Sequence, residues 1–296
     1  MKCICRMMNA EYLTHILLAL LVCLCGCGAE TDNSGVSLYD DQEIEAQSGM
    51  ESEGGETTSG SMTGGAVIGG ERFDVPEVWA RHHVMIGLVE LPAFGIQLSE
   101  TRTILLTTIS RENGLLLSKE ETCQIDIERP EANGVQTIIP QSFVDSLSFL
   151  NRPLYIEDNQ ISYAQLIQLQ GVHLRDPIND ELPRDMEDPR IFDQDQDGQP
   201  GLTLLIAGLI EGNLQIIQRL TTQLSGEING DQMEGILTWT TEEPVINGSN
   251  EILNRDVPMT PHPELQSYFV GQRVGSEYTC ADLIREADTL FWIPEL

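Results

Sequence analysis

The sequence predicts a mainly β protein, folded as an antiparallel barrel or a sandwich with one or two short helices. Short runs rich in Val, Ile, Leu and Thr recur from residue 84 onward, which is typical of strands. Asn-Gly pairs follow several of these runs, and this dipeptide favours tight hairpin turns because glycine accepts a positive φ. Helical spacing of apolar residues is confined to two segments. Many short strands joined by tight turns indicate a barrel or a sandwich.

The first group of strands is expected before residue 170. An Asn113-Gly114 turn separates two members of this group, and a second Asn-Gly pair follows at residue 133. The apolar and β-branched runs that define these strands are residues 84–91, 101–109, 115–118, 123–128, 155–156 and 161–169.

A four-stranded antiparallel meander is expected in the second half of the chain. Short glycine-containing turns separate its strands, which predicts that consecutive strands pair with one another. The four strands are residues 202–210, 214–220, 224–228 and 235–241. A further run at residues 269–274 is expected to close the sheet.

Two helices are expected beside these strands. The first is short and covers residues 141–150, with Phe143, Leu147 and Leu150 at helical spacing. The second begins after Thr279, an N-cap residue with Asp282 three positions later as a capping box. Its expected apolar face consists of Leu283, Ile284, Ala287, Leu290 and Phe291.

The entry to the first long strand resembles that of calycin barrels. Val78-Trp79-Ala80 precedes the run at residues 84–91, and a tryptophan in this place plugs one end of a calycin barrel. The resemblance rests on this tryptophan and on the antiparallel strand order. It implies a calycin-like barrel with Trp79 buried at one end.

The N-terminus resembles the signal peptide of bacterial lipoproteins. Lys2 and Arg6 precede an apolar run at residues 13–24, and Leu24-Cys25-Gly26-Cys27 matches a lipobox, with an aliphatic residue at −3 and a small residue at −1. The resemblance implies cleavage after residue 26 and acylation of Cys27. Gly28 stands where an inner-membrane retention signal would have Asp. We therefore expect a lipid-anchored protein of the cell envelope, at the periplasmic or surface face of the outer membrane.

The rest of the chain divides into a tether and one folded region. Residues 27–71 are rich in Gly, Ser and Thr, and from residue 28 they hold ten acidic residues and neither Lys nor Arg. Such a segment buries too little apolar surface to fold, so a disordered tether is expected. Residues 72–296 are expected to form a single β-rich domain with 14 basic and 36 acidic residues.

Two cysteines remain for the folded region. Four of the seven precede the expected cleavage site and Cys27 is the expected acylation site, which leaves Cys123 and Cys280. An even pair in an oxidising compartment predicts a disulfide, with two buried free thiols as the alternative.

The charge of the chain excludes one class of partner. Sixteen Lys and Arg stand against 47 Asp and Glu, a formal net charge of −31. A nucleic-acid binder that works through a basic surface is therefore excluded, because no positive surface is available to neutralise phosphates.

One motif carries the chemistry of a metal site. Asp193, Asp195 and Asp197 alternate with glutamines and lead into Gly198. The pattern resembles the calcium loops of EF-hand, dockerin and thrombospondin-type repeats. By this resemblance the three carboxylates bind Ca²⁺, together with the backbone carbonyl of Gln199.

This motif departs from an EF-hand at its end. The twelfth position is Leu204 and not a bidentate Glu, so further oxygens would come from Asp188, Glu187 or Glu211. The alternative is an acidic turn between β segments. The segment before it, residues 174–197, is expected to be a solvated connector.

Catalytic motifs are missing from the sequence. No G-x-S-x-G, S-x-x-K, P-loop or dinucleotide-binding pattern occurs. His82 and His83 are adjacent in a strand, so they face opposite sides of the sheet and do not share a metal.

Two function classes follow. The first is a membrane-anchored extracytoplasmic β module that binds a ligand, an envelope protein or a surface polysaccharide, with Ca²⁺ stiffening one loop. The alternative is an extracytoplasmic hydrolase that uses carboxylates among the 36 in the folded region. A deep cavity with converging polar groups would favour a ligand binder or an enzyme, and a filled core would favour a surface module.

Overall fold

A computed structural model describes residues 76–91, 94–128 and 134–292 of the chain. The expected signal peptide, Cys27 and the tether at residues 27–71 lie outside the described residues. No helix within the described residues has the length and apolar character needed to cross a membrane.

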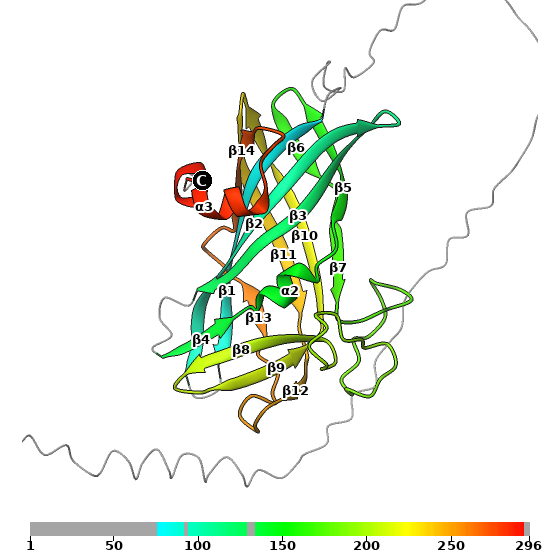
Figure 1. The fold of residues 1–296 in the computed structure, drawn as a ribbon, viewed down its shortest axis with the longest axis vertical. Coiled ribbons are helices and arrows are strands. Elements are labelled where there is room, and N and C mark those ends of the chain that lie inside the picture. The colour runs from blue at the N-terminus through cyan, green and yellow to red at the C-terminus, as the bar shows by residue number, and fades with distance from the viewer. Residues whose placement is uncertain (1–75, 92–93, 129–133, 293–296) are drawn as a thin grey trace, which may run out of the picture. The chain divides into compact units, whose positions relative to one another are not determined.

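The described chain is mainly antiparallel β structure with two short helices, as the sequence predicts (Figure 1). The strands are β1 Glu77–Leu91, β2 Gly95–Glu112, β3 Leu115–Glu128, β4 Val135–Ile138, β5 Leu150–Glu157, β6 Gln160–Tyr163, β7 Leu166–Gln170, β8 Leu202–Gly208, β9 Gly212–Ile216, β10 Gln218–Asn229, β11 Gln232–Glu242, β12 Val245–Gly248, β13 Met259–Pro261 and β14 Tyr268–Val274. The helices are α2 Gln141–Asp145 and α3 Cys280–Leu290.

The main sheet closes on itself. The pairing runs β11-β14-β1-β2-β3-β5-β6-β10, and β10 pairs in turn with β11, so eight strands form a continuous antiparallel ring. The expectation that residues 269–274 close the sheet is confirmed, because β14 pairs with both β1 and β11. Closure leaves no free edge within this ring.

A second sheet makes part of the fold sandwich-like. It has the order β12-β9-β8-β4 and lies beside the lower ends of β1, β2 and β3 in Figure 1. Its apolar side chains, among them Leu204, Ile206 and Leu214, pack with Ile125 of β3. The two arrangements that the sequence leaves open therefore occur together: a closed ring, and a smaller sheet stacked on part of it.

The expected four-stranded meander is wrong in one pairing. β8 pairs with β9 and β10 pairs with β11, but β9 belongs to the second sheet and β10 to the ring. The chain passes from one sheet to the other at Ile217, a fully buried residue in an apolar cluster with Val172 and Ile246. Burial of Ile217 outweighs the short-range preference for consecutive pairing.

The strands of the first half are longer than the sequence predicts. The expected runs at 115–118 and 123–128 are one strand, β3, with an irregularity at Cys123. Ile104 pairs with Gln124 while Leu105 pairs with Thr122, so Cys123 is an extra residue. This bulge exchanges the two faces of β3, because side chains alternate along a strand.

The bulge directs different side chains inward on its two sides. Before it, Ser118, Glu120 and Thr122 face the interior of the ring; after it, Ile125 and Ile127 do so. Cys123 itself faces α3 on the outside.

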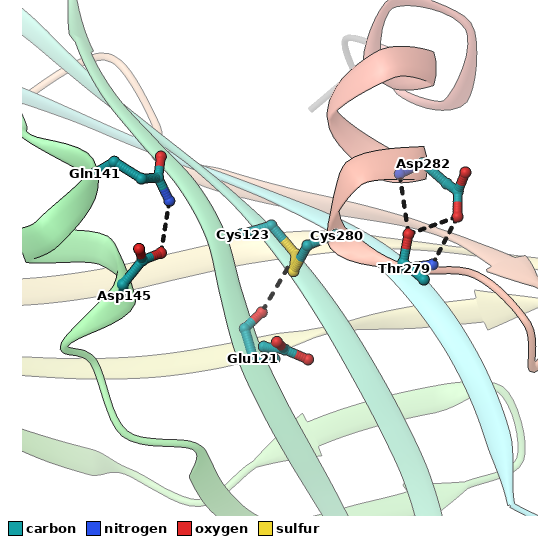
Figure 2. Close-up of a disulfide and its surroundings, with 7 residues drawn as sticks. All are labelled: Glu121, Cys123, Gln141, Asp145, Thr279, Cys280 and Asp282. Atoms are coloured by element: carbon teal, nitrogen blue, oxygen red, sulfur yellow. Dashed lines mark hydrogen bonds between the residues drawn. A yellow bond between two sulfur atoms is a disulfide. The ribbon is translucent and has the colours of Figure 1, made fainter.

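The C-terminal helix α3 is fixed to the outside of the ring by a disulfide (Figure 2). Cys123 and Cys280 are bonded, with Cα atoms 5.0 Å apart, which confirms the expected pairing. Thr279 and Asp282 form the expected capping box, and the Thr279 hydroxyl is the main cause that lowers the pKa of Asp282 to about 2. The apolar face of α3 packs on the outer side of the ring through Leu283, Ala287, Leu290 and Phe291. Ile284, expected on this face, is 42% exposed.

The expected helix at residues 141–150 is shorter in the structure. α2 covers Gln141–Asp145, where Phe143 and Val144 are buried, and β5 begins at Leu150. Pairing of Leu150 with Glu120 of β3 takes the end of the expected helix into the sheet.

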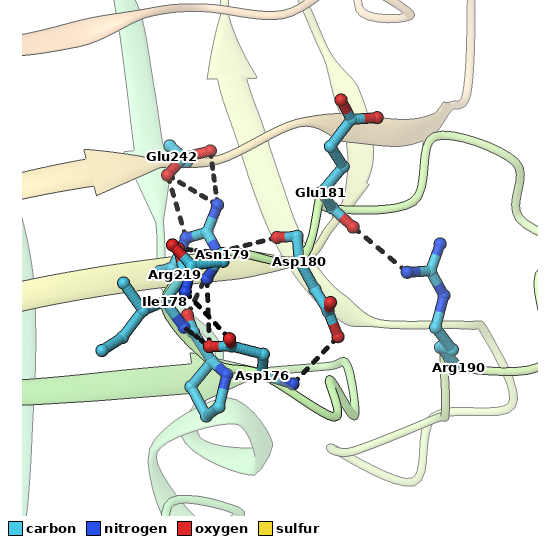
Figure 3. A network of polar contacts seen from close by, with 9 residues as sticks. Asp176, Ile178, Asn179, Asp180, Glu181, Arg190, Arg219 and Glu242 are labelled. Carbon is cyan, nitrogen blue, oxygen red and sulfur yellow. Dashed lines mark hydrogen bonds and ion pairs between the residues drawn. The ribbon is translucent and has the colours of Figure 1, made fainter. Parts of the chain in front are cut away.

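The acidic connector before β8 is held by one arginine of β10 (Figure 3). Arg219 donates from Nη1 to the carbonyls of Pro177, Ile178 and Asp180 at 2.8–3.2 Å, and it pairs with both carboxylate oxygens of Glu242. Three side chains of the connector, Leu174, Leu182 and Ile191, also pack on a buried apolar cluster. The expectation of a purely solvated connector is therefore wrong in part.

Candidate functional site

An internal cavity of about 200 Å³ lies between the ring and the second sheet. Its 38 lining residues come from both sheets, from α2 and from the loop after β12. Twenty-four of them are apolar, which makes the space suitable for an apolar ligand or an apolar part of one. The lining includes Ile252 of the loop after β12, a residue that is 54% exposed.

The inward side chains of β1, taken in order along the strand, pass from a packed apolar region through polar residues to the cavity. Trp79 is fully buried in an apolar cluster that fills one end of the ring, in keeping with the expected plug. Arg81 and His83 come next, and Met85, Val89 and Leu91 line the cavity. His83 and Leu91 both line it and are eight residues apart, which corresponds to roughly 27 Å of strand.

A layer of polar side chains separates the filled end from the cavity. We call it the polar layer, and it consists of Arg81, His83, Ser118, Glu120, Arg152 and Thr222. All except His83 are among the buried polar residues, and His83 is partly buried. His83, Glu120, Arg152 and Thr222 line the cavity.

Glu120 is the anion of the polar layer. Its Oε1 accepts hydrogen bonds from Arg81 Nη1 at 2.8 Å and from Ser118 Oγ at 3.0 Å. Arg81 and Glu120 are 0% and 1% exposed, so this is a fully buried ion pair. The Arg81 guanidinium also lies 4.6 Å from the centre of the Tyr163 ring, a cation–π distance.

Arg152 is a second buried cation without a carboxylate of its own. Its Nη2 donates to Thr222 Oγ1 at 2.7 Å, and its side chain is 2% exposed. Nε and Nη1 have no hydrogen-bond partner among the described residues. Burial is the main cause that lowers the pKa of Arg152; Glu120 opposes this shift and Arg81 adds to it.

His83 is neutral in the polar layer. Arg81 Nη2 lies 2.8 Å from His83 Nε2, and because a guanidinium only donates, Nε2 must accept and the proton sits on Nδ1. Burial first, and then Arg81 and Arg152, hold the pKa of His83 well below its ordinary value. His82 faces the opposite side, as the sequence predicts, and stacks on Phe291 at 5.1 Å.

The polar layer therefore carries one uncompensated positive charge. Arg81 and Arg152 contribute two, Glu120 removes one, and His83 contributes none. A buried charge without a partner is costly, which makes this layer a place where an anionic group of a ligand would be stabilised.

Further along the cavity, three more buried polar atoms lack a partner among the described residues. They are Ser99 Oγ, Gln170 Oε1 and Thr241 Oγ1, and all three side chains line the cavity. Buried polar atoms are nearly always hydrogen-bonded, so three unpaired ones in side chains that line one cavity favour a polar ligand group or water there.

The acidic motif forms a second, separate cluster. One carboxylate oxygen each of Asp193, Asp195 and Asp197 lie within 4.8 Å of one another, so the three side chains could hold a metal ion. Backbone N–H groups of Asp197 and Gly198 donate to Asp193, and Thr203 Oγ1 donates to Asp197. As expected, a strand follows this loop, because β8 begins at Leu202.

Asp195 is the buried member of this cluster. It is 6% exposed; its Oδ2 accepts from the Thr203 N–H, and its Oδ1 has no partner among the described residues. Burial raises the pKa of Asp195, and Asp197 and Asp193 add to this effect. Burial and the two neighbouring carboxylates all disfavour the ionised form of Asp195. A cation bound here would stabilise that form.

The expected additional ligands are placed elsewhere or stay untested. Asp188 pairs with Arg190 at 2.9 Å, and the cluster within the described chain holds only the three aspartates. Gln199 donates its N–H to Asp197 Oδ1; the role of its carbonyl stays a prediction.

Sequence reasoning missed the polar layer. Arg81, Glu120 and Arg152 are far apart in the chain and meet only because β1, β3 and β5 stand in one ring. One signal was present: Leu150, Arg152, Leu154 and Ile156 alternate in β5, so an arginine occupies an otherwise apolar face.

The chain was also compared with known proteins. No model of a protein family, no curated protein and no solved structure matches it. The functional argument therefore rests on the site itself.

Proposed function

We propose that this protein is a lipid-anchored module of the bacterial cell envelope that binds a small, largely apolar ligand in its internal cavity. The observation that supports binding is the cavity, which has a mostly apolar lining and the buried groups of the polar layer at one end. Enclosed apolar spaces with a few placed polar groups are typical of small-ligand sites. A filled interior would have supported a surface module instead.

The alternative of a hydrolase has less support from the site. The carboxylates that line the cavity are Glu120 and Glu243; Glu120 is paired with Arg81, and Glu243 accepts from Gln218 Nε2 at 2.6 Å. Within the described residues, no hydroxyl that lines the cavity is hydrogen-bonded to His83. The usual arrangement of a nucleophile beside a base is thus missing from this lining.

Filling the cavity tests the proposed function. Met85→Trp places a larger side chain in the cavity, and we expect it to lower the affinity for a neutral, environment-sensitive apolar dye about tenfold or more. Because the new side chain fills existing space, the melting temperature should stay the same or rise. The measurement is a fluorescence titration of the wild type and the variant.

Thr240→Trp is the matched control. Thr240 is exposed, and its neighbour Trp239 faces the interior, so this change adds the same side chain to the outside. It should leave dye affinity unchanged. Equal affinities in all three proteins, or no binding to the wild type, would contradict a cavity that binds apolar ligands.

We also propose that the acidic cluster binds Ca²⁺. Three carboxylates are fewer than the six to eight oxygens that Ca²⁺ takes, so we expect weak affinity, with Kd on the order of 10⁻⁴–10⁻³ M. At tenfold excess over Kd, the stabilisation is about 1 kcal/mol. Thermal melts with EDTA and with millimolar Ca²⁺ should differ for the wild type and coincide for Asp195→Asn.

Asp188→Asn serves as the control for this measurement. It removes a neighbouring carboxylate that pairs with Arg190 outside the cluster, so its Ca²⁺ response should match that of the wild type. A Ca²⁺ response that survives in Asp195→Asn would place the cation elsewhere.

The anchor is proposed from the lipobox at Leu24-Cys25-Gly26-Cys27. Two or more acyl chains give stable membrane attachment, since each buried CH₂ contributes about 0.8 kcal/mol. Cys27→Ala should move the protein from the membrane fraction to the soluble fraction. Unchanged membrane fractionation of Cys27→Ala would show that something else holds the protein there.

A further inference from the structure

The polar layer contains a buried cation that points to the chemistry of the ligand. Arg152 lines the cavity, is 2% exposed and leaves Nε and Nη1 without a partner among the described residues. An arginine that is buried in this way is costly unless an anion approaches it. Its recorded protein partners are neutral: the Thr222 hydroxyl, and the Tyr163 ring, whose centre lies 5.8 Å from the guanidinium.

Glu120 does not serve as the counter-ion of Arg152. Glu120 Oε1 is already engaged by Arg81 Nη1 and Ser118 Oγ, and no carboxylate lies within ion-pair distance of Arg152 among the described residues. Glu243, the other carboxylate of the lining, follows the end of β11 and accepts a hydrogen bond from Gln218 Nε2 at 2.6 Å. One negative charge beside Arg152 would bring the charge of the polar layer to zero.

The lining of the cavity next to Arg152 indicates the chemistry of the rest of the ligand. From the polar layer, the lining continues along β1 from Met85 to Leu91 and is mostly apolar. On the opposite side it is formed by apolar side chains of the second sheet, including Leu204, Ile206 and Leu214. The cavity therefore combines one positive end with a long apolar space, roughly 27 Å along the strand.

We propose that the ligand is an amphipathic single-chain carboxylate, whose head group pairs with Arg152 and whose apolar chain lies between the ring and the second sheet. This inference rests on the proposed function and adds the ligand class. The unpartnered Nε and Nη1 of Arg152 are donors that a carboxylate can accept from, and such charge-assisted hydrogen bonds are about twice as strong as neutral ones. Ser99, Gln170 and Thr241 remain for water or for a polar substituent on the chain.

Two probes that differ only in the head group test this proposal. Dodecanoate and dodecan-1-ol carry the same chain, and each is titrated against the neutral dye bound to the whole folded protein. We expect the wild type to bind the acid about tenfold more tightly than the alcohol. In Arg152→Gln, affinity for the acid should fall to that of the alcohol, while affinity for the alcohol changes by less than about twofold.

Arg102→Gln is the matched control. It removes the same charge from a half-exposed arginine that pairs with Glu100 and Glu128 outside the cavity. The preference for the acid should survive this change. A loss of preference that is equal in both variants would overturn the proposal, because it would reflect the charge of the whole protein.

A second measurement uses only the wild type, so it does not depend on whether a variant folds. Dodecanoate labelled with ¹³C at the carboxyl carbon, bound to the wild type, should keep its ionised chemical shift to a pH below the ordinary pKa of a carboxylic acid. A raised pKa of the bound acid would show a head group away from the guanidinium and overturn the proposal. Equal binding of acid and alcohol would overturn the ligand class alone, whereas failure of the dye to bind would overturn the proposed function.

Discussion

Glu120→Gln is expected to lower the free energy of unfolding by about 3–5 kcal/mol, because it leaves a buried cation without its counter-ion. Glu120 is the one carboxylate of the polar layer, and its partner Arg81 is fully buried. Gln keeps the size of the side chain and an oxygen that accepts from Arg81 Nη1, so the loss reports mainly the charge. Chemical denaturation of the wild type and the variant, with the same slope in denaturant, measures it.

Two further variants show whether the effect is specific. Glu128→Gln on the same strand removes a half-exposed partner of Arg102 and should cost at most about 1 kcal/mol. Arg152→Gln should cost little or should stabilise the protein without ligand, because it removes a buried cation next to Arg81. A large loss for Arg152→Gln together with a small loss for Glu120→Gln would contradict the charge balance that we assign to the polar layer.

Removal of the disulfide should have an effect of similar size. The bond joins residues 157 positions apart, and the chain-entropy model gives about 5 kcal/mol for a loop of this length, an upper value. We expect the double variant Cys123→Ser with Cys280→Ser to lose about 2–5 kcal/mol in chemical denaturation. A reducing agent should produce the same loss in the wild type and none in the variant.

The position of α3 gives this prediction a structural readout. Cys280 is the first residue of α3 (Figure 2). Leu283 of this helix is fully buried, in a cluster with Ala80 and Ile104 of the ring. Without the bond, amide protons of α3 should exchange faster than those of β1 and β2. A change in stability below about 1 kcal/mol would mean that the loop closure contributes little and that packing alone holds the helix.

The fold could be predicted from the sequence where local signals are strong. Strand positions followed from β-branched runs and Asn-Gly turns, and the capping box of α3 followed from Thr279 and Asp282. The disulfide followed from the count of cysteines. These features depend on residues close in sequence or on covalent chemistry, both of which a single sequence displays.

The pairing of β9 and the bulge in β3 depend on contacts between residues far apart in the sequence, which local sequence patterns do not indicate. The pairing of β9 with β12, in place of β10, depends on Ile217 passing between two sheets. The bulge at Cys123 exchanges the inward face of β3, so alternation taken across the whole strand would place the side chains on one side of the bulge wrongly. Both features shape the lining of the cavity, to which β3 contributes Ile125 and Ile127 after the bulge and β9 contributes Leu214 and Ile216.

The candidate sites show the same division. The aspartate cluster was visible in the sequence because its members are two residues apart, and the structure brings their oxygens within 4.8 Å. The polar layer was not visible, because Arg81, Glu120 and Arg152 come from three strands. A charged residue on the apolar face of a strand, such as Arg152 in β5, is the sequence signal that points to such a layer.

The most direct test of the account is to locate a ligand in the cavity. A crystal structure of the protein with 2-bromododecanoate would place the bromine by its anomalous signal, one carbon away from the carboxylate. The account predicts a single bromine peak in the cavity, beside Arg152 of the polar layer. The chain should extend from there between β1 and the second sheet. Bromine found only on the outer surface, or only water beside Arg152 in a crystal saturated with the ligand, would contradict it.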